Sequence, residues 1–316
     1  MRHLVTGGAG FLGAALTHQL VAEGEKVTVL DRMSRGKWER LPKAAKVLVG
    51  DIRNGPLVRR AVMRADVVWH LAYVQGTQTF YADPKDVISV ALGGIVNVMD
   101  GCELHPGQDL ILVSSSEVYQ NPPEGMYPTD ETVPLSVPDV TNPRYSYGGG
   151  KIASELAVMA YARAGTIDRA VIVRPHNIYG PDMGWDHVIP QFAQRMAALP
   201  MGERAFPIQG SGLETRSFCY ISDCVSGLLT AWRHGEDRTV YHLGNPAEEH
   251  TISDLAHMVG AWYGREVDVV PGVLPPGSPT RRCPDISRLR ALGWEPEFSL
   301  DQGLDLTLRW YKEQSV

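Results

Sequence analysis

A tyrosine and a lysine four residues apart, Tyr147 and Lys151, are the residues of this sequence best suited to do chemistry together. On a helix this spacing places both side chains on one face. An ammonium beside a phenol favours the ionised phenol, and a phenolate available at neutral pH is a general base for a substrate hydroxyl. Apolar residues continue at helical spacing after Lys151, whereas Pro84 interrupts the equally spaced Tyr81 and Lys85. The pattern therefore favours Tyr147 and Lys151 as a catalytic pair.

A glycine-rich turn near the start of the chain predicts a phosphate site. Residues 2–6 read as a short buried strand, the segment TGGAGFLG follows at once, and an apolar helical pattern comes next. Gly7 allows a tight turn, Gly10 lets backbone approach a pyrophosphate, and Gly13 lets helix and strand pack closely. The N-terminus of the helix adds unpaired N–H groups for the anion. Strand, turn and helix together predict a dinucleotide-binding site.

An acidic residue at the end of the next predicted strand bears on the choice of dinucleotide. Asp31 follows the strand 27–30, where it can accept hydrogen bonds from both ribose hydroxyls and repel a 2′-phosphate. Arg32 and Arg35 could neutralise such a phosphate, so NAD is favoured over NADP without being decided. Two further strands are predicted at 47–49, with Asp51 and Ile52 after it to flank adenine, and at 66–72, where His70 is interpreted as a packing residue.

Composition bounds the class of protein. With 316 residues, 44% hydrophobic and 21% charged, the chain can form one large α/β domain with a smaller lobe. A net charge of -6 without a long basic run argues against nucleic-acid or membrane-surface partners. Four cysteines form no metal-like spacing with histidine, so free thiols, no metal and a cytoplasmic location are expected. No signal segment and no apolar run long enough to span a bilayer is recognised.

These stretches resemble the extended short-chain dehydrogenase/reductase family of NAD-dependent nucleotide-sugar epimerases, dehydratases and decarboxylases. The matching motifs run from TGGAGFLG to RRCPDIS and LGWEP, across almost the whole chain. The resemblance implies an α/β fold with a Rossmann-type doubly wound parallel sheet and a smaller C-terminal substrate-binding lobe. Residues 1–174 would form the NAD-binding domain, and residues 175–316 mainly the nucleotide-sugar lobe, with some segments returning to the first domain. A homodimer is also implied.

The resemblance assigns roles at the catalytic centre. Ser115 would hydrogen-bond the sugar O4 and Tyr147 would take its proton while C4 gives its hydride to the nicotinamide. Lys151 would hold the cofactor ribose and lower the pKa of Tyr147. Glu117 resembles decarboxylases and 4,6-dehydratases, in which it acts on the C5 proton or orients the sugar, whereas 4-epimerases generally have a neutral residue there. Ser116 stands where many dehydratases have Asp.

The patterns and the resemblance together give a set of binding residues. Cofactor contacts are expected from Gly7, Gly10, Phe11, Leu12, Gly13, Asp31, Asp51, Ile52, Leu71, Ala72, Tyr147, Lys151 and Pro175. Substrate contacts are expected from Tyr73, Ser115, Ser116, Asn177, His187, Val188, Arg216 and Arg282. By resemblance, Asn177 and the two arginines reach the diphosphate, for which the planar, always charged guanidinium is well suited.

Other local departures from the family pattern are visible. Ala91 replaces a usual Asn, and Gln120 replaces a usual Gly. The run Gly148–Gly150 costs about 1 kcal/mol per residue in a helix relative to Ala, so close approach of a cofactor, a substrate or another helix is expected there.

The sequence favours 4-epimerisation of a nucleotide-linked hexose or hexuronate, with UDP as the favoured nucleotide, through a transient 4-keto sugar. UDP-glucuronate decarboxylation and sugar dehydration remain alternatives, and Glu117 counts against the epimerase. Asp182 stands where decarboxylases often have Arg, and Ser116 weakens the dehydratase. A regulator that senses NAD without chemistry is the alternative of another class, disfavoured because Ser115, Tyr147 and Lys151 are all kept.

Overall fold

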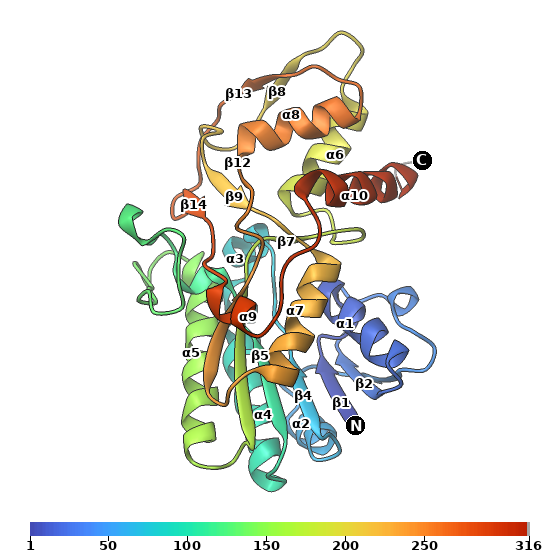
Figure 1. Ribbon diagram of the computed structural model, residues 1–316, viewed down its shortest axis with the longest axis vertical. Coiled ribbons are helices and arrows are strands. Elements are labelled where there is room, and N and C mark those ends of the chain that lie inside the picture. Colours follow the sequence, from blue (N-terminus) through green and yellow to red (C-terminus); the bar gives the residue numbers. More distant parts are fainter. Residues whose placement is uncertain (315–316) are drawn as a thin grey trace.

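A seven-stranded parallel sheet lies at the centre of the molecule, in a computed structural model that describes residues 1–314 (Figure 1). In chain order its strands are β1 (Arg2–Thr6), β2 (Lys26–Asp31), β3 (Lys46–Val49), β4 (Val67–His70), β5 (Asp109–Val113), β6 (Arg169–Pro175) and β11 (Thr239–Leu243). Across the sheet the order is β11-β6-β5-β4-β1-β2-β3, and every neighbouring pair is parallel. The order reverses between β1 and β4, and ligands bind at such a switch point in open α/β sheets. The predicted Rossmann-type doubly wound sheet is confirmed.

Helices cover both faces of this sheet. One face carries α2 (Gly55–Val62), α4 (Pro84–Leu104) and α5 (Tyr145–Arg163), and the other carries α1 (Phe11–Ala22), α7 (Ile221–His234) and α9 (Ser287–Ala291). Alternation along a strand explains the two cores, because Leu110 and Leu112 of β5 pack with the first set of helices. Ile111 and Val113 of the same strand pack with the second set. Both cores hold the carboxyl ends of the strands at one edge, where the site lies.

A smaller lobe stands beyond that edge and has a core of its own (Figure 1). Its elements are α6 (Val188–Ala198), β8 (Ala205–Pro207), β9 (Thr215–Ser217), β12 (Glu249–Thr251), α8 (Ile252–Trp262), β13 (Asp268–Val270), β14 (Arg281–Arg282) and α10 (Leu300–Gln314). Shorter elements complete the described chain: α3 (Thr77–Ala82), β7 (Ile178–Tyr179), β10 (Cys219–Tyr220), and the 3₁₀ helices η1 (Trp38–Arg40), η2 (Ser116–Val118) and η3 (Glu124–Met126). Between lobe segments the chain returns to the large sheet through α7, β11 and α9.

Helix α4 corrects one expectation from the sequence. Within residues 1–314, one helix is long enough and apolar enough to cross a membrane, and that helix is α4. The expectation that the chain has no such apolar run was therefore wrong. Half of its most apolar window is buried, and Val87, Val90 and Ile95 belong to the core beneath it. A core helix of a globular protein has this same composition, because it packs against a sheet and a neighbouring helix at once.

The three glycines of α5 have separate explanations. A Cβ at Gly148 would lie 2.7 Å from the carbonyl oxygen of Glu117 and 2.4 Å from Nε2 of Gln120. A Cβ at Gly150 would lie 2.6 Å from Cβ of Ala91 on α4. Gly148 therefore lets the loop after β5 approach α5, and Gly150 lets the two helices pack. Gly149 meets only an ordinary contact, 3.6 Å from a methyl group of Val137.

Candidate active site

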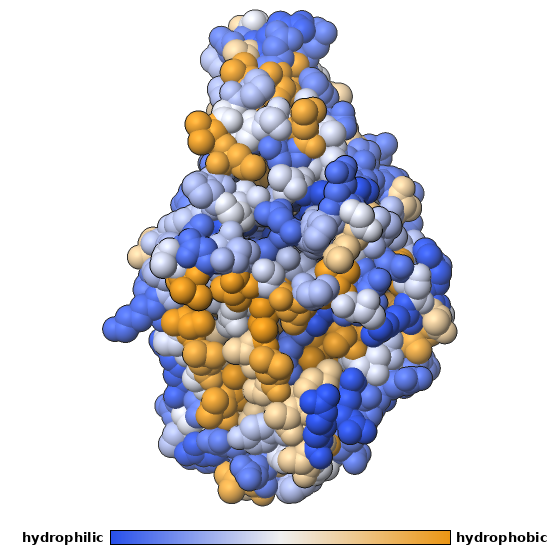
Figure 2. All heavy atoms as spheres, turned by 90° about the vertical axis from the view of Figure 1, so that its left-hand side faces the viewer, coloured by the Kyte–Doolittle hydropathy of each residue, from blue (hydrophilic) through white to orange (hydrophobic). Residues whose placement is uncertain are grey.

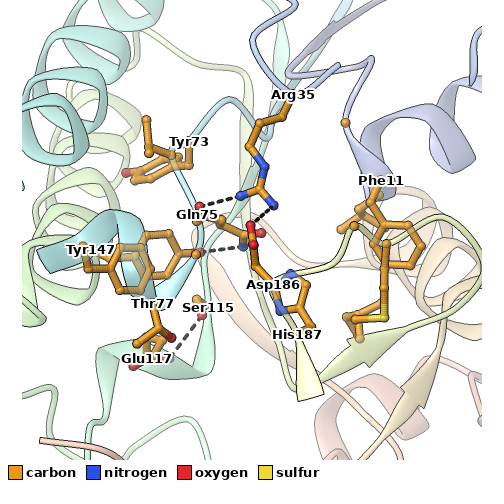
Figure 3. Close-up of a pocket in the computed structure, with 18 of the residues that line it drawn as sticks. Phe11, Arg35, Tyr73, Gln75, Thr77, Ser115, Glu117, Tyr147, Asp186 and His187 are labelled. Carbon is orange, nitrogen blue, oxygen red and sulfur yellow. Dashed lines mark hydrogen bonds and ion pairs between the residues drawn. The ribbon is translucent and has the colours of Figure 1, made fainter. Parts of the chain in front are cut away.

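A cavity of about 1520 Å³ lies between the carboxyl edge of the sheet and the smaller lobe (Figure 3). The predicted site residues that line it are Gly7, Gly10, Phe11, Leu12, Gly13, Asp31, Ile52, Leu71, Ala72, Tyr73, Ser115, Ser116, Glu117, Tyr147, Lys151, Pro175, Asn177, His187, Val188, Arg216 and Arg282. Asp51 is the exception. Its carboxylate lies 2.6 Å from Nη2 of Arg53, which holds the pKa of Asp51 at about 2, and it is not part of the cavity wall.

The glycine turn at one end of the cavity fits a dinucleotide. Gly7 has φ +69°, and a Cβ there would lie 2.9 Å from Cα of Ala72. A Cβ at Gly13 would lie 2.2 Å from the carbonyl oxygen of Gly7, so no side chain is possible. Helix α1 begins at Phe11, directly after the turn, and no side chain caps its first N–H groups. The backbone thus presents free donors and a helix N-terminus to a pyrophosphate.

Asp31 is held in place by this same backbone. Its carboxylate accepts hydrogen bonds from the amide of Ala9 at 3.0 Å and from the amide of Met33 at 2.8 Å. Both contacts keep the carboxylate at the end of β2, where ribose hydroxyls bind in dinucleotide-binding folds.

The two arginines that could have accepted a 2′-phosphate are already paired. Nη2 of Arg32 lies 2.8 Å from Asp86, and Nη2 of Arg35 lies 3.0 Å from Asp186 of the smaller lobe. Neither charge is left to offset the repulsion between Asp31 and a 2′-phosphate. The geometry agrees with NAD rather than NADP.

Tyr147 lies in the first turn of α5, with its phenol directed into the cavity (Figure 3). Its hydroxyl accepts a hydrogen bond of 3.0 Å from Nε2 of Gln75 and also interacts with the hydroxyl of Ser115. The ring stacks on Phe80 with 5.0 Å between centroids. Burial raises the pKa of Tyr147 to about 12, and the contacts with Gln75 and Ser115 act in the opposite direction.

The ammonium of Lys151 contacts the end of β5 and the ring of Tyr73. It donates to the carbonyl oxygen of Val113 at 2.6 Å and lies 3.3 Å from the ring centroid of Tyr73. The centroid of the Tyr147 ring is 5.7 Å away. Burial lowers the pKa of Lys151 itself well below its usual value. Burial is the largest influence on the pKa of both Tyr147 and Lys151. That Lys151 lowers the pKa of Tyr147 stays a prediction.

A cluster of charges surrounds Glu117 in the part of the cavity where the resemblance places the sugar, here called the sugar end. Oε1 of Glu117 lies 2.7 Å from Nη2 of Arg282 and 3.5 Å from Nη2 of Arg144. Burial by itself would raise the pKa of this carboxyl, but Arg282 and Arg144 hold it below its usual value. Glu117 is therefore an ionised carboxylate, and Arg282, which we expected on a diphosphate, is its ion-pair partner.

The other predicted diphosphate ligands are positioned by backbone carbonyls. Arg216 donates to the carbonyl oxygen of Thr215 at 2.7 Å and to that of Pro279 at 2.7 Å. Burial, reinforced by nearby Arg282, lowers the pKa of Arg216 to about 9. Asn177 donates to the carbonyl oxygen of Ser217 at 2.8 Å. These bonds orient both side chains along the cavity wall.

Sequence reasoning missed Gln75 and Arg144. Gln75 follows β4, and Arg144 immediately precedes α5 and is almost fully buried. Each had a usable signal: Gln75 comes after the carboxyl end of a central strand, where ligands bind, and Arg144 lies three residues before Tyr147. What the sequence lacked was the loop path that brings them to Tyr147 and Glu117.

Comparison with known proteins places this geometry in a family. Residues 3–244 match the NAD-dependent epimerase/dehydratase family. The chain belongs to that family. It is 31% identical to UDP-glucuronic acid decarboxylase 1 of Danio rerio over 99% of this chain and 73% of that protein.

Solved structures of family members superpose closely on this chain. A UDP-glucose 4-epimerase of Thermotoga maritima has a TM-score of 0.89 at 26% identity, covering 99% of both chains. The UDP-glucose 4-epimerase of Thermus thermophilus in complex with NAD has a TM-score of 0.87 at 29% identity, again covering 99% of both chains. The predicted family, fold and cofactor, NAD, are therefore confirmed for this epimerase/dehydratase family member. Within residues 1–314 no group of His, Cys, Asp and Glu side chains could hold a metal ion.

Proposed function

We propose that this protein is an NAD-dependent enzyme that decarboxylates a nucleotide-linked hexuronate, with UDP-glucuronate as the first candidate. The observation that carries the proposal is the pairing of one carboxylate, Glu117, with two guanidiniums, Arg282 and Arg144, beside Tyr147. Because the positive charge exceeds the negative charge there, a second carboxylate, that of the sugar, can bind without uncompensated repulsion. The resemblance to curated decarboxylases supports the same reaction.

The residues divide the work as follows. Tyr147 takes the proton of the C4 hydroxyl, and Ser115 holds O4 by a hydrogen bond. NAD, when bound, would supply the acceptor for the C4 hydride and its source for the final reduction. The sugar carboxylate then lies β to a ketone, so the C5–C6 bond breaks, its electron pair moves toward O4, and carbon dioxide leaves. Tyr147 and Ser115 stabilise the negative charge that develops on O4, and C5 takes up a proton from water. Tyr147 returns its proton to O4 when C4 regains the hydride.

The Glu117 cluster has to bind the sugar carboxylate without stabilising its ground state too much. Arg282 and Arg144 attract it, while the ionised Glu117 weakens that attraction and favours its departure as neutral carbon dioxide. A neutral side chain at position 117 would leave both guanidiniums to stabilise the ground state.

The direct test is incubation of the purified protein with NAD and a panel of UDP-, dTDP- and GDP-sugars, read by mass and NMR. We expect UDP-glucuronate to lose carbon dioxide and give a UDP-pentose. Unchanged mass with a new configuration at C4 would replace the proposal by 4-epimerisation, and loss of water would replace it by dehydration. NAD binding without any product from the panel would favour the non-catalytic regulator.

The second candidate is the 4-epimerisation that the sequence favoured. Asp182, where decarboxylases often have Arg, is held here by Lys37 at 2.9 Å and Arg40 at 2.5 Å at the cavity rim. The likeness to UDP-glucose 4-epimerases in solved structures supports this candidate as well. In that reaction Glu117 would orient the sugar and no bond at C5 would break.

We further propose that the protein works as a homodimer in the cytoplasm. Figure 2 shows a broad apolar area on the side where α5 lies in Figure 1. Exposed apolar side chains on the neighbouring helices α4 and α5 include Leu92, Val96 and Leu156, the last of which is 67% exposed. Apolar areas of this kind mark protein interfaces. Analytical ultracentrifugation should show a dimer, and Leu156→Glu should convert it to a monomer. The cytoplasmic location is supported by the four buried free cysteines, which suit a reducing compartment.

A further inference from the structure

The amide of Gln75 is a polar partner of the catalytic phenol that no sequence motif indicated. Gln75 lies in the loop between β4 and α3, and its Nε2 donates to the Tyr147 hydroxyl at 3.0 Å (Figure 3). An amide N–H can only donate. It therefore stabilises a phenolate oxygen, which can only accept, more than it stabilises a phenol.

The position of Gln75 is fixed by a contact that crosses the cavity. Arg35, in the segment after β2, donates through Nη1 to the backbone carbonyl oxygen of Gln75 at 2.5 Å. Through Nη2 it binds Asp186, just before α6 of the smaller lobe, at 3.0 Å. Figure 3 shows Asp186, Arg35, Gln75 and Tyr147 as a continuous line of contacts from the lobe to the phenol. Gly76, at φ +114°, makes the turn that this path requires.

We propose that Gln75 is a positioning residue for the general base: it donates a hydrogen bond that stabilises the Tyr147 phenolate, and Arg35, anchored by Asp186, holds Gln75 in place. The ionisation of Tyr147 then depends on the smaller lobe being docked over the cavity, because Asp186 belongs to that lobe. This role is common to every reaction that begins at the C4 hydroxyl, so it does not rest on the choice of decarboxylation.

Other groups face Tyr147 from each element packed against it. They are Lys151 on its own helix, Tyr73 after β4, Ser115 and Glu117 after β5, and Arg282 of β14. Glu117 raises the pKa of Tyr147 and Arg282 lowers it, so the effects of these two ion-pair partners on that pKa partly cancel. Among the contacts that oppose burial, the hydrogen bond from Gln75 is the largest, ahead of that from Ser115.

The test measures the ionisation of Tyr147 in the NAD complex, without any sugar. Tyrosine labelled with carbon-13 at Cζ reports phenolate formation by NMR, and the signal lost in Tyr147→Phe identifies the residue. Gln75→Leu removes the hydrogen-bond donor and keeps a side chain of similar size. It should raise the pH midpoint of Tyr147 ionisation by about one unit, a tenfold change in the ionisation constant. Gln75→Glu keeps the shape but replaces a donor by a negative charge, so it should raise the midpoint further.

The order wild type, Leu, Glu is the signature that a merely structural role would not produce. Gln78→Leu, the same substitution at an exposed position of α3, is the matched control and should leave the ionisation midpoint of Tyr147 unchanged. Circular dichroism and NAD affinity establish that each variant is folded. A midpoint that stays constant across folded Gln75 variants would overturn the proposal.

A double-mutant cycle tests the part of Arg35. Arg35→Ala alone should raise the midpoint in the same direction as Gln75→Leu, because the loop loses its anchor. In the Gln75→Leu background it should add nothing, since the residue it positions has lost its donor. Fully additive shifts would mean that Arg35 acts on Tyr147 by charge alone, and would overturn its positioning role.

Discussion

The two ends of the cavity are built in different ways. The phosphate and ribose part of the cofactor end comes from one contiguous stretch, from β1 to Met33, and is shaped by backbone: the turn Gly7–Gly13 and the amides that hold Asp31. The sugar end joins segments far apart in the sequence through side-chain charges, with Glu117 after β5, Arg144 before α5 and Arg282 on β14.

This difference predicts how each end fails when it is altered. A backbone-built site fails sterically, through an added Cβ that has no space, while the electrostatics of the other end stay intact. A charge-built site fails electrostatically, because removing one partner leaves a buried charge uncompensated. Tyr147 lies between the two ends and should separate binding from chemistry.

The largest effect is expected for Tyr147→Phe. The variant loses one oxygen and no volume, so NAD and nucleotide-sugar affinities should stay nearly unchanged. The rate should fall by the general-base factor of about 10² to 10⁴ or more. Tyr145→Phe, two residues earlier on the same helix and also buried, is the matched control. Steady-state kinetics and isothermal titration measure both quantities, and normal turnover in Tyr147→Phe would move the base elsewhere.

The second effect tests the sugar end through Glu117→Gln, which keeps the shape and removes the charge. Without the charge of Glu117, both guanidiniums stabilise the bound sugar carboxylate in the ground state, so release of carbon dioxide should slow roughly 10²-fold, equivalent to about 3 kcal/mol of activation free energy. Formation of NADH on mixing should persist, because oxidation at C4 does not need this charge. Glu249→Gln, which breaks the neighbouring pair with Arg281 at 2.8 Å, is the control and should affect turnover little.

The contrary result for Glu117→Gln is equally specific. A loss of no more than tenfold, with UDP-glucose converted to its C4 epimer, would assign the charge to sugar orientation and favour 4-epimerisation. Incorporation of solvent deuterium at C5 without loss of carbon dioxide would instead indicate proton abstraction there, as in a dehydratase.

The cofactor end could be predicted from the sequence much better than the sugar end. The glycine requirement is local, since Gly13 faces the carbonyl of Gly7 only six positions away, so the turn, its helix and Asp31 could be recognised without coordinates. The parallel sheet was predicted from the family resemblance, to which this turn contributes. The Glu117–Arg282 pair joins residues 165 positions apart, and no spacing rule connects them. For the same reason the diphosphate assignment of Arg282 came from the resemblance alone.

The pKa of Tyr147 shows the same limit of a local sequence pattern. Tyr147 and Lys151 were correctly placed on one helix, but the ionisation of Tyr147 depends on burial by Phe80 and Tyr73, which come from another part of the chain. Helical periodicity predicts on which face of a helix a side chain lies. It does not predict how strongly that side chain is desolvated, and desolvation shifts the pKa.

The third effect tests the cofactor end through Gly13→Val. Its Cβ would lie 2.2 Å from the Gly7 carbonyl, so the turn must shift at a cost of about 1–3 kcal/mol. NAD affinity should fall by roughly one to two orders of magnitude in a titration. Gly125→Val, at a position with open space around it, should leave the affinity unchanged. Unaltered NAD binding by Gly13→Val would contradict the steric account of this end.

The smallest effect concerns the discrimination between NAD and NADP by Asp31, the carboxylate that the glycine turn holds at the end of β2. Asp31→Ala removes the acceptor for the ribose hydroxyls, which should weaken NAD by roughly tenfold, the value of about one hydrogen bond to a charged group. NADP should improve relative to NAD, because the repulsion of its 2′-phosphate disappears. The improvement should stay modest, since Arg32 and Arg35 remain paired with Asp86 and Asp186. Asp51→Asn is the control: its carboxylate is bound to Arg53 outside the cavity wall, so the NAD/NADP ratio should not change. If Asp51→Asn changed the ratio as much as Asp31→Ala, discrimination would belong to the charge of the whole segment and not to one carboxylate held by the turn.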